Sequence, residues 1–389
     1  MNKTAGFEIK KVFLLLVLMF GTAINCHGRF SMEYIGKRTK LFYNGTPISF
    51  LQCVNQQLQR YPESRIQDIV LFARQAANGS TGISTDKKQA WKAFQKEFSS
   101  TVPADIPLVE IISPDFCRIN FGAWKKAGLP AKWLFNMWYA SMTMGPQDLK
   151  IFKGYISLLK RVPGIKHTEL LEYIKNTQDD LKKHSAHYIK KYRPAYCVIS
   201  TRFLTAFPVL KAASKLPERP VKVIAVDGKA ASGKTTLAKY LALILETDAV
   251  HMDDFFLPME LRSKARLSEP GGNVHYERFM TEVLPFLHQK KAFSYRRFDC
   301  SEMQIGATQN ISISSWRIVE GAYSLHPKFG NYADLKVFFN ISPEEQIARI
   351  RKRNGERKAK DFISRWIPME EKYISAFNIK KQANIILGN

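Results

Sequence analysis

The stretch Val221-Lys-Val-Ile-Ala-Val-Asp227, followed by Gly228-Lys-Ala-Ala-Ser-Gly-Lys-Thr-Thr236, decides how the rest of this sequence is interpreted. A β-branched apolar run that ends at a glycine-rich octet predicts a buried strand, a phosphate-binding loop and the first turn of a helix. Leu237, Leu241 and Ile244 continue at helical spacing and give that helix an apolar face. An ordinary glycine turn is the alternative, and the strand before the loop and the helix after it argue against that alternative.

The predicted loop has the chemistry of an anion-binding site. Gly228 and Gly233 allow backbone N–H groups to approach a polyphosphate closely at the N-terminus of a helix. Lys234 would reach the β- and γ-phosphates, and the hydroxyl group of Thr235 would bind Mg²⁺. We therefore expect the nucleotide to be bound by Gly228, Lys229, Ala230, Ala231, Ser232, Gly233, Lys234, Thr235 and Thr236.

Two later segments are apolar runs that end in carboxylates. Residues 248–253 predict a short strand that ends at Asp253, and residues 317–321 predict an inner strand that ends at Glu320. The carboxyl ends of parallel strands line the ligand crevice, so both acids are expected beside the phosphates. Asp253 would accept the proton of an attacking hydroxyl group or hold Mg²⁺, and Glu320 would hold Mg²⁺. A helix-capping role for Asp254 and an exposed strand end for Glu320 are the structural alternatives.

These motifs together resemble the uridine kinase family of phosphate-loop kinases, whose relatives include phosphoribulokinase and bacterial pantothenate kinases. The resemblance covers residues 221–389, under half of the chain. It implies an adenylate-kinase-like parallel sheet and transfer of the γ-phosphoryl group of ATP to a hydroxyl group of a small molecule, with ATP and Mg²⁺ as cofactors. By resemblance, Asp253 is the catalytic aspartate, and Glu320 and Thr235 are the magnesium ligands.

An arginine-rich helix is predicted near the C-terminus. Ser342 with the following proline and a glutamate three residues on is typical of a helix start. Arg349, Arg351, Arg353 and Arg357 follow around a glycine, where the resemblance implies a mobile lid. Arginines in a lid can neutralise charge on the transferred phosphoryl group, and we rank Arg357 and Arg353 first.

The acceptor is less defined than the nucleotide site. The resemblance implies a nucleoside, whereas Arg296 and Arg297 favour an anionic substrate of the pantothenate or sugar-phosphate type. Each candidate contact is also a plausible surface or capping residue. The candidate contacts are Tyr276, Arg278, Tyr295, Arg297 and Asp299.

The N-terminal half predicts a separate, mostly α-helical domain. Helical apolar spacing runs from about residue 48 to 183, and two prolines within residues 215–220 mark a boundary before the kinase-like domain. We therefore expect a signal-like or artefactual extension at 1–31, a helical accessory domain at 32–214 and a phosphate-loop α/β domain at 215–389. A cluster of polar residues in this half could line an anion site, although core and capping roles are favoured for its candidates Arg118, His184, His187 and Arg193.

Composition limits the partners. The net charge of +25 predicts an anionic partner, but the basic residues are spread along the chain, so we expect a small-molecule substrate and no nucleic acid. The alternative is an ATP-regulated protein that binds nucleic acid or a protein partner, and a homo-oligomer is left open. Five cysteines without metal spacing are typical of free thiols in a reducing compartment.

The first residues conflict with this cytoplasmic expectation. Basic residues precede the apolar run 12–20, which is the outline of a secretory signal but is too short to span a bilayer. We interpret residues 1–31 as an upstream extension before a start at Met32, with export or membrane tethering as the alternative.

Overall fold

The computed structural model describes residues 30–35, 38–43, 46–80, 84–142, 144, 149–177, 183–299 and 302–388. The apolar run 12–20 lies outside these residues, as does nearly all of the predicted extension. The chain divides into two compact units, Met1–Leu204 and Thr205–Asn389. Among the residues described, no helix is both long enough and apolar enough to cross a membrane.

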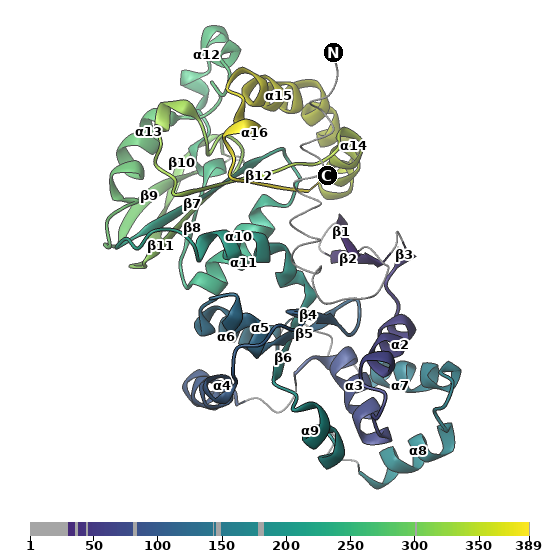
Figure 1. Cartoon of the computed structure of the whole chain (residues 1–389). Helices are drawn as coiled ribbons and strands as arrows, with labels where there is room; N and C mark the ends of the chain where they lie inside the picture. Colours follow the sequence, from purple (N-terminus) through teal and green to yellow (C-terminus); the bar gives the residue numbers. More distant parts are fainter. Residues whose placement is uncertain are drawn as a thin grey trace, which may run out of the picture. The chain divides into compact units, whose positions relative to one another are not determined.

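The first unit is mostly helical, as the sequence predicts (Figure 1). Its helices bury one apolar face each; in α3, for example, Ile69, Val70 and Ala73 are all buried. Cys53, Cys117 and Cys197 are free and buried in this unit. The helices are α2 (Phe50–Arg60), α3 (Ile66–Asn78), α4 (Lys87–Ser100), α5 (Phe121–Lys126), α6 (Ala131–Ser141), α7 (Leu149–Leu158), α8 (His167–Asn176) and α9 (Ala186–Tyr192).

Two small antiparallel sheets accompany these helices, and the helical periodicity did not predict them. One has the strand order β4 (Val109–Ile111), β5 (Phe116–Asn120) and β6 (Tyr196–Ser200), so it pairs segments about 80 residues apart. The other contains β1 (Phe30–Ile35), β2 (Arg38–Tyr43) and β3 (Thr46–Pro47). The strands β4, β5 and β6 give little periodic signal, because a run of three to five residues fits either period.

The second unit is a parallel α/β domain, as predicted. Its five-stranded sheet has the order β13-β12-β7-β11-β8, and every neighbouring pair is parallel. The glycine-rich loop leaves the central strand, and the strands that precede the two predicted acids lie on one side of it. β11 ends at Glu320 as predicted, whereas β8 ends at His251, two residues before Asp253, because residues 252–255 form a 3₁₀ turn. The strands are β7 (Lys222–Gly228), β8 (Ala249–His251), β11 (Trp316–Glu320), β12 (Leu335–Phe339) and β13 (Ile385–Leu387).

Helices cover both faces of this sheet (Figure 1). Val223 and Ala225 of β7 face a core shared with α13, α15 and α16, while the alternate residues face α11 because strand side chains have a period of two. An antiparallel hairpin, β9 (Phe293–Asp299) and β10 (Gln304–Ile311), packs on the first of these cores. The helices are α10 (Phe207–Ala213), α11 (Lys234–Leu245), α12 (Lys264–Ser268), α13 (Tyr276–Glu282), α14 (Pro343–Asp361), α15 (Ile367–Ala376) and α16 (Ile379–Gln382).

The arginine-rich helix α14 has the predicted start and the predicted break. The Ser342 hydroxyl group accepts a hydrogen bond from the Glu345 N–H, and a proline occupies the first turn. Gly355 departs from helical geometry with a φ of 78°. A single π-helical turn, Phe362–Trp366, follows α14 and leads directly into α15, with Pro368 in the first turn of α15.

The turn from β7 into the loop requires a glycine. Gly228 has a φ of 140°, and a Cβ atom there would overlap the backbone of Phe339 on the neighbouring strand β12. The backbone of β12 therefore packs so closely against Gly228 that only the hydrogen atom of a glycine fits there.

We expect Gly228→Ala to lower the free energy of unfolding by more than about 3 kcal/mol, because backbone overlap adds to the conformational cost. Gly330→Ala is the matched control, since its φ is 66° and no atom lies within 4 Å of the added Cβ. That control should lose only about 1 kcal/mol. Urea unfolding of both variants measures the difference, and equal losses would contradict the steric argument.

Candidate phosphate-binding site

The loop between β7 and α11 has the geometry of an anion nest. Gly228, Ala231 and Gly233 all have positive φ values, of 140°, 58° and 116°, which is the alternating backbone geometry typical of an anion nest. Lys234 is 8% exposed, and its Nζ donates to the backbone oxygen of Lys229 at 2.8 Å. The loop thus closes on its own lysine directly before the first helical turn.

Glu320 joins the loop to the neighbouring strands. The Thr235 hydroxyl group donates to Glu320 Oε2 at 3.2 Å, and His251 Nδ1 lies 2.5 Å from Glu320 Oε1. Glu320 is 4% exposed, and the hydrogen bond to it raises the pKa of His251. His251 lies within the strand predicted over residues 248–253, but we did not predict a role for this histidine.

Asp253 and its neighbour Asp254 have different surroundings. Asp253 lies in a short 3₁₀ turn, Met252–Phe255, and is accessible to solvent. Desolvation of its carboxyl group by neighbouring protein atoms raises the pKa of Asp253, and the negative charge of Glu320 raises it further. Asp254 is buried, and it accepts hydrogen bonds from Tyr295 Oη at 2.8 Å and Arg297 Nε at 3.1 Å.

The residues present fit a magnesium ion. The Thr235 hydroxyl group and the carboxylates of Glu320 and Asp253 are the hard oxygen ligands that Mg²⁺ prefers. Within the described ranges, no group of three or more His, Cys, Asp or Glu side chains could hold a metal by itself. A magnesium ion in this region would therefore use the threonine and phosphate oxygens as well.

A second set of contacts reaches the loop from α14 and α15. Glu370 is buried and accepts a hydrogen bond from the Ala230 N–H at 2.9 Å, and Glu371 pairs with Lys229 Nζ at 2.5 Å. Arg349 donates to the backbone oxygens of Ala231 and Ser232 at 3.2 and 3.1 Å. The sequence carries no local signal for these contacts, because the partners are more than 100 residues apart.

The two arginines ranked first in the sequence lie elsewhere on α14. Arg353 is exposed, donates to the side chain of Asn354 at 2.7 Å and lies over the ring of Phe362. Arg357 is also exposed. Both follow Arg349 by one or two turns, so a role at the phosphates stays a prediction for them.

The predicted acceptor residues are mostly engaged within the protein. Arg278 is buried and pairs through two nitrogens with Glu282, at 2.9 and 3.0 Å. Tyr276 is buried between Arg266 and Lys328. Tyr295 and Arg297 donate to the carboxylate of Asp254, and Arg278 donates to the backbone oxygen of Asp254. Asp299 lies exposed at the end of β9.

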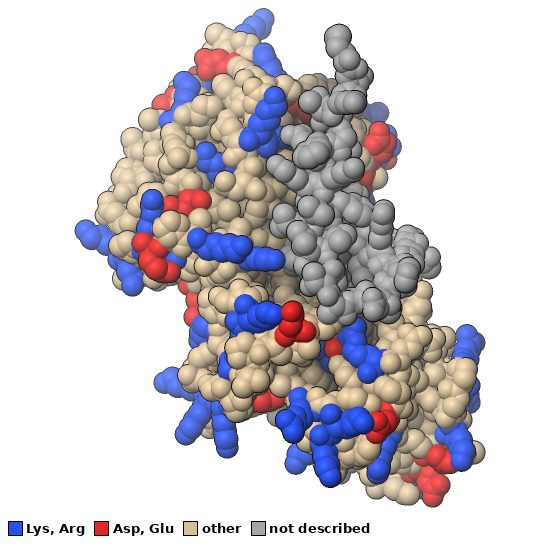
Figure 2. Space-filling model, viewed as in Figure 1, with Lys and Arg blue, Asp and Glu red and all other residues tan. Residues whose placement is uncertain are grey.

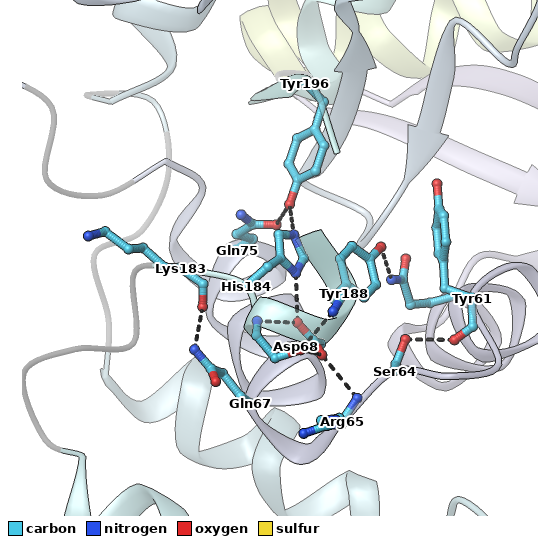
Figure 3. Close-up of polar contacts among 12 residues, drawn as sticks. Tyr61, Ser64, Arg65, Gln67, Asp68, Gln75, Lys183, His184, Tyr188 and Tyr196 are labelled. Atoms are coloured by element: carbon cyan, nitrogen blue, oxygen red, sulfur yellow. Dashed lines mark hydrogen bonds and ion pairs between the residues drawn. The ribbon is translucent and has the colours of Figure 1, made fainter. Parts of the chain in front are cut away.

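The polar residues of the first unit form a buried network (Figure 3). His184 lies between Asp68 and Tyr196, with contacts of 3.0 and 2.6 Å, and burial lowers the pKa of His184. Arg118 is 1% exposed and donates to Gln57 and Gln75. Of the other candidates, His187 pairs with Glu63 at 2.9 Å, and Arg193 caps α9 with a left-handed backbone.

Basic side chains are dispersed over the visible face of the molecule, and acidic side chains lie among them (Figure 2). This view agrees with the spread of lysine and arginine along the sequence, which gives a net charge of +25.

No protein-family model and no curated protein match the sequence. Solved structures are similar over slightly less than half of the chain. A possible uridine kinase from Bacillus stearothermophilus is 19% identical with a TM-score of 0.36, covering 47% of this chain and 97% of its own. A proposed fructose transport system kinase from a Silicibacter species is 18% identical with a TM-score of 0.40, covering 47% and 98%. The D-glycerate 3-kinase of Cryptococcus neoformans is 14% identical with a TM-score of 0.31, covering 44% and 86%.

We expect the stability gained by Glu370→Gln to depend on pH. Burial raises the pKa of Glu370 from 4.5 to about 7, so the folded protein loses stability as the pH rises from 4.5 to 7, and glutamine does not share this loss. At about 1.4 kcal/mol per pKa unit, the advantage of the variant should grow by roughly 3 kcal/mol between pH 4.5 and pH 8. Urea unfolding at both pH values measures it, and a constant difference would contradict the burial of an ionisable carboxyl group.

Proposed function

We propose that the second unit is an ATP-dependent kinase that transfers the γ-phosphoryl group to a hydroxyl group of a small molecule, with a nucleoside as the first acceptor class. One observation carries the proposal: Thr235, which follows Lys234 in the loop, contacts Glu320, and Glu320 contacts His251, two residues before Asp253. The parallel pairing of β11 with β7 and with β8 supports this proposal, because the carboxyl ends of adjacent parallel strands lie at one edge of a sheet.

Each group has a distinct task in this proposal. The loop amides and Lys234 bind and orient the triphosphate, which supplies much of the rate by positioning. Thr235 and Glu320 would hold Mg²⁺, which neutralises phosphate charge when bound. His251 donates to Glu320, and this contact fixes the orientation of the carboxylate toward Thr235.

Asp253 is the proposed general base. Its carboxyl group is accessible to solvent, as a group must be that takes a proton from an incoming hydroxyl group. The raised pKa of Asp253 makes its carboxylate a stronger base than that of an ordinary aspartate, and the positive charges of Lys234 and His251 favour the ionised form. Asp254 cannot take this part, because Tyr295 and Arg297 already bind its two oxygens.

We expect Asp253→Asn to lower kcat by about a hundredfold to ten-thousandfold, because an amide cannot accept the hydroxyl proton. ATP affinity should change by less than about threefold, since the loop that binds the phosphates is intact. Asp361→Asn, at the exposed end of α14, is the control. ADP release and calorimetric ATP binding give the two readouts, and full turnover by Asp253→Asn would refute the assignment of the base.

The acceptor is found by measuring ADP release from the purified full chain with ATP and Mg²⁺. The panel contains nucleosides, sugars, glycerate, pantothenate and sugar phosphates, so that neutral and anionic hydroxyl compounds are compared directly. Phosphorylation of one class supports the proposal. ATP binding without transfer to any of them, together with salt-sensitive retention on polyanions, would favour an ATP-regulated binding protein instead.

A further inference from the structure

A carboxyl group of the protein already binds an amide of the phosphate loop. Glu370 Oε2, on α15, accepts a hydrogen bond from the Ala230 N–H at 2.9 Å. Ala230 lies between the two glycines of the loop, where backbone N–H groups serve oxyanions of a nucleotide. A carboxyl oxygen and a phosphate oxygen have the same hydrogen-bonding chemistry, so they compete for such an amide.

Glu370 is built into this position. Its side chain is 7% exposed, and Gln346 Nε2 of α14 lies 3.4 Å from the same oxygen. Burial raises the pKa of Glu370 to about 7, so the carboxyl group near neutral pH spends much of its time uncharged. Three ionisable groups act on Glu370 through their charges: Lys234 on α11, Asp227 on β7 and Asp253 in the 3₁₀ turn after β8. Glu370 in turn acts on Tyr323, which follows β11.

We infer that Glu370 is a latch on the nucleotide-free loop: its carboxyl group occupies the Ala230 amide and must leave before a triphosphate can use it. This inference rests on the nucleotide-binding part of the proposed function and adds a regulated step to it. The latch links the loop to two helices, because Glu370 lies on α15 and its oxygen is also contacted by Gln346 of α14. Arg349, one turn after Gln346 on α14, donates to the loop carbonyls. Entry of the nucleotide therefore breaks a contact that holds α14 and α15 against the loop.

The test compares MgATP affinity of the full chain and its variants by calorimetry at pH 6. At this pH the wild-type Glu370 is mostly protonated, so glutamine is a neutral mimic that keeps the acceptor oxygen. Glu370→Ala removes the acceptor. Glu370→Asp keeps the carboxyl group but is one methylene too short to reach, and it decides the same question if the alanine variant fails to fold. Glu344→Ala, an exposed glutamate in the first turn of α14, is the control.

We expect Glu370→Ala and Glu370→Asp to bind MgATP about tenfold more tightly than the wild type, which is the effect of one competing hydrogen bond. Glu370→Gln and Glu344→Ala should stay within about twofold of the wild type. Unchanged or weaker binding by the alanine and aspartate variants would overturn the latch. An equal gain in the glutamine variant would also overturn it, because glutamine keeps the acceptor oxygen.

The same measurements separate the latch from the kinase proposal. If no variant binds MgATP, the nucleotide site is wrong and the latch falls with it. If Glu370→Ala gains affinity while ADP release is absent with every acceptor, the latch stands and phosphoryl transfer does not.

Discussion

The buried carboxylate of Asp227 is the contact on which the second unit depends. It lies at the end of the central strand and is 1% exposed. Three backbone N–H groups donate to it, from Gly228, Tyr323 and Leu325, and Tyr373 Oη donates at 2.7 Å. One carboxylate thereby fixes the start of the loop, the segment after β11 and helix α15. A buried acid is stable only when its oxygens are satisfied, so these three segments must assemble around it.

That assembly explains why Glu370 and Glu320 reach the loop from opposite directions. Tyr373 is three residues after Glu370 on α15, so the bond from Tyr373 to Asp227 also sets the position of Glu370 relative to Ala230. On the other side, β11 pairs with β7 in parallel register and ends at Glu320, beside Thr235. The backbone geometry thus sets the shape of the loop. Glu370 on α15 and Glu320 on β11 determine whether the Ala230 N–H and the Thr235 hydroxyl group are free to bind a ligand.

The fold of the second unit could be predicted because its signals are local. A strand, a glycine-rich loop and a helix lie consecutively in residues 221–245, and the acids Asp253 and Glu320 directly follow apolar runs. The partners that set the state of the site could not be predicted in the same way. Glu370 lies 140 residues after Ala230, in a helix whose sequence gives no sign of contact with the loop. The sheet of β4, β5 and β6 in the first unit was missed for the same reason, since β6 pairs with β5 across about 80 residues.

Residue type alone does not separate a functional site from a core network. The first unit contains an aspartate, a histidine, a tyrosine and an arginine in contact, which would suit catalysis if they faced solvent. There, Arg118 is buried and its guanidinium group is bound by Gln57 and Gln75, so its donors already serve the fold. Asp253 has the opposite character, with an accessible carboxyl group and a pKa raised by its surroundings. The same logic applies to Arg296 and Arg297, which in the sequence favour an anionic acceptor. In the structure Arg296 pairs with Glu282 and Arg297 pairs with Asp254. The positive charge that these arginines offer to a substrate is therefore much smaller than the sequence indicates.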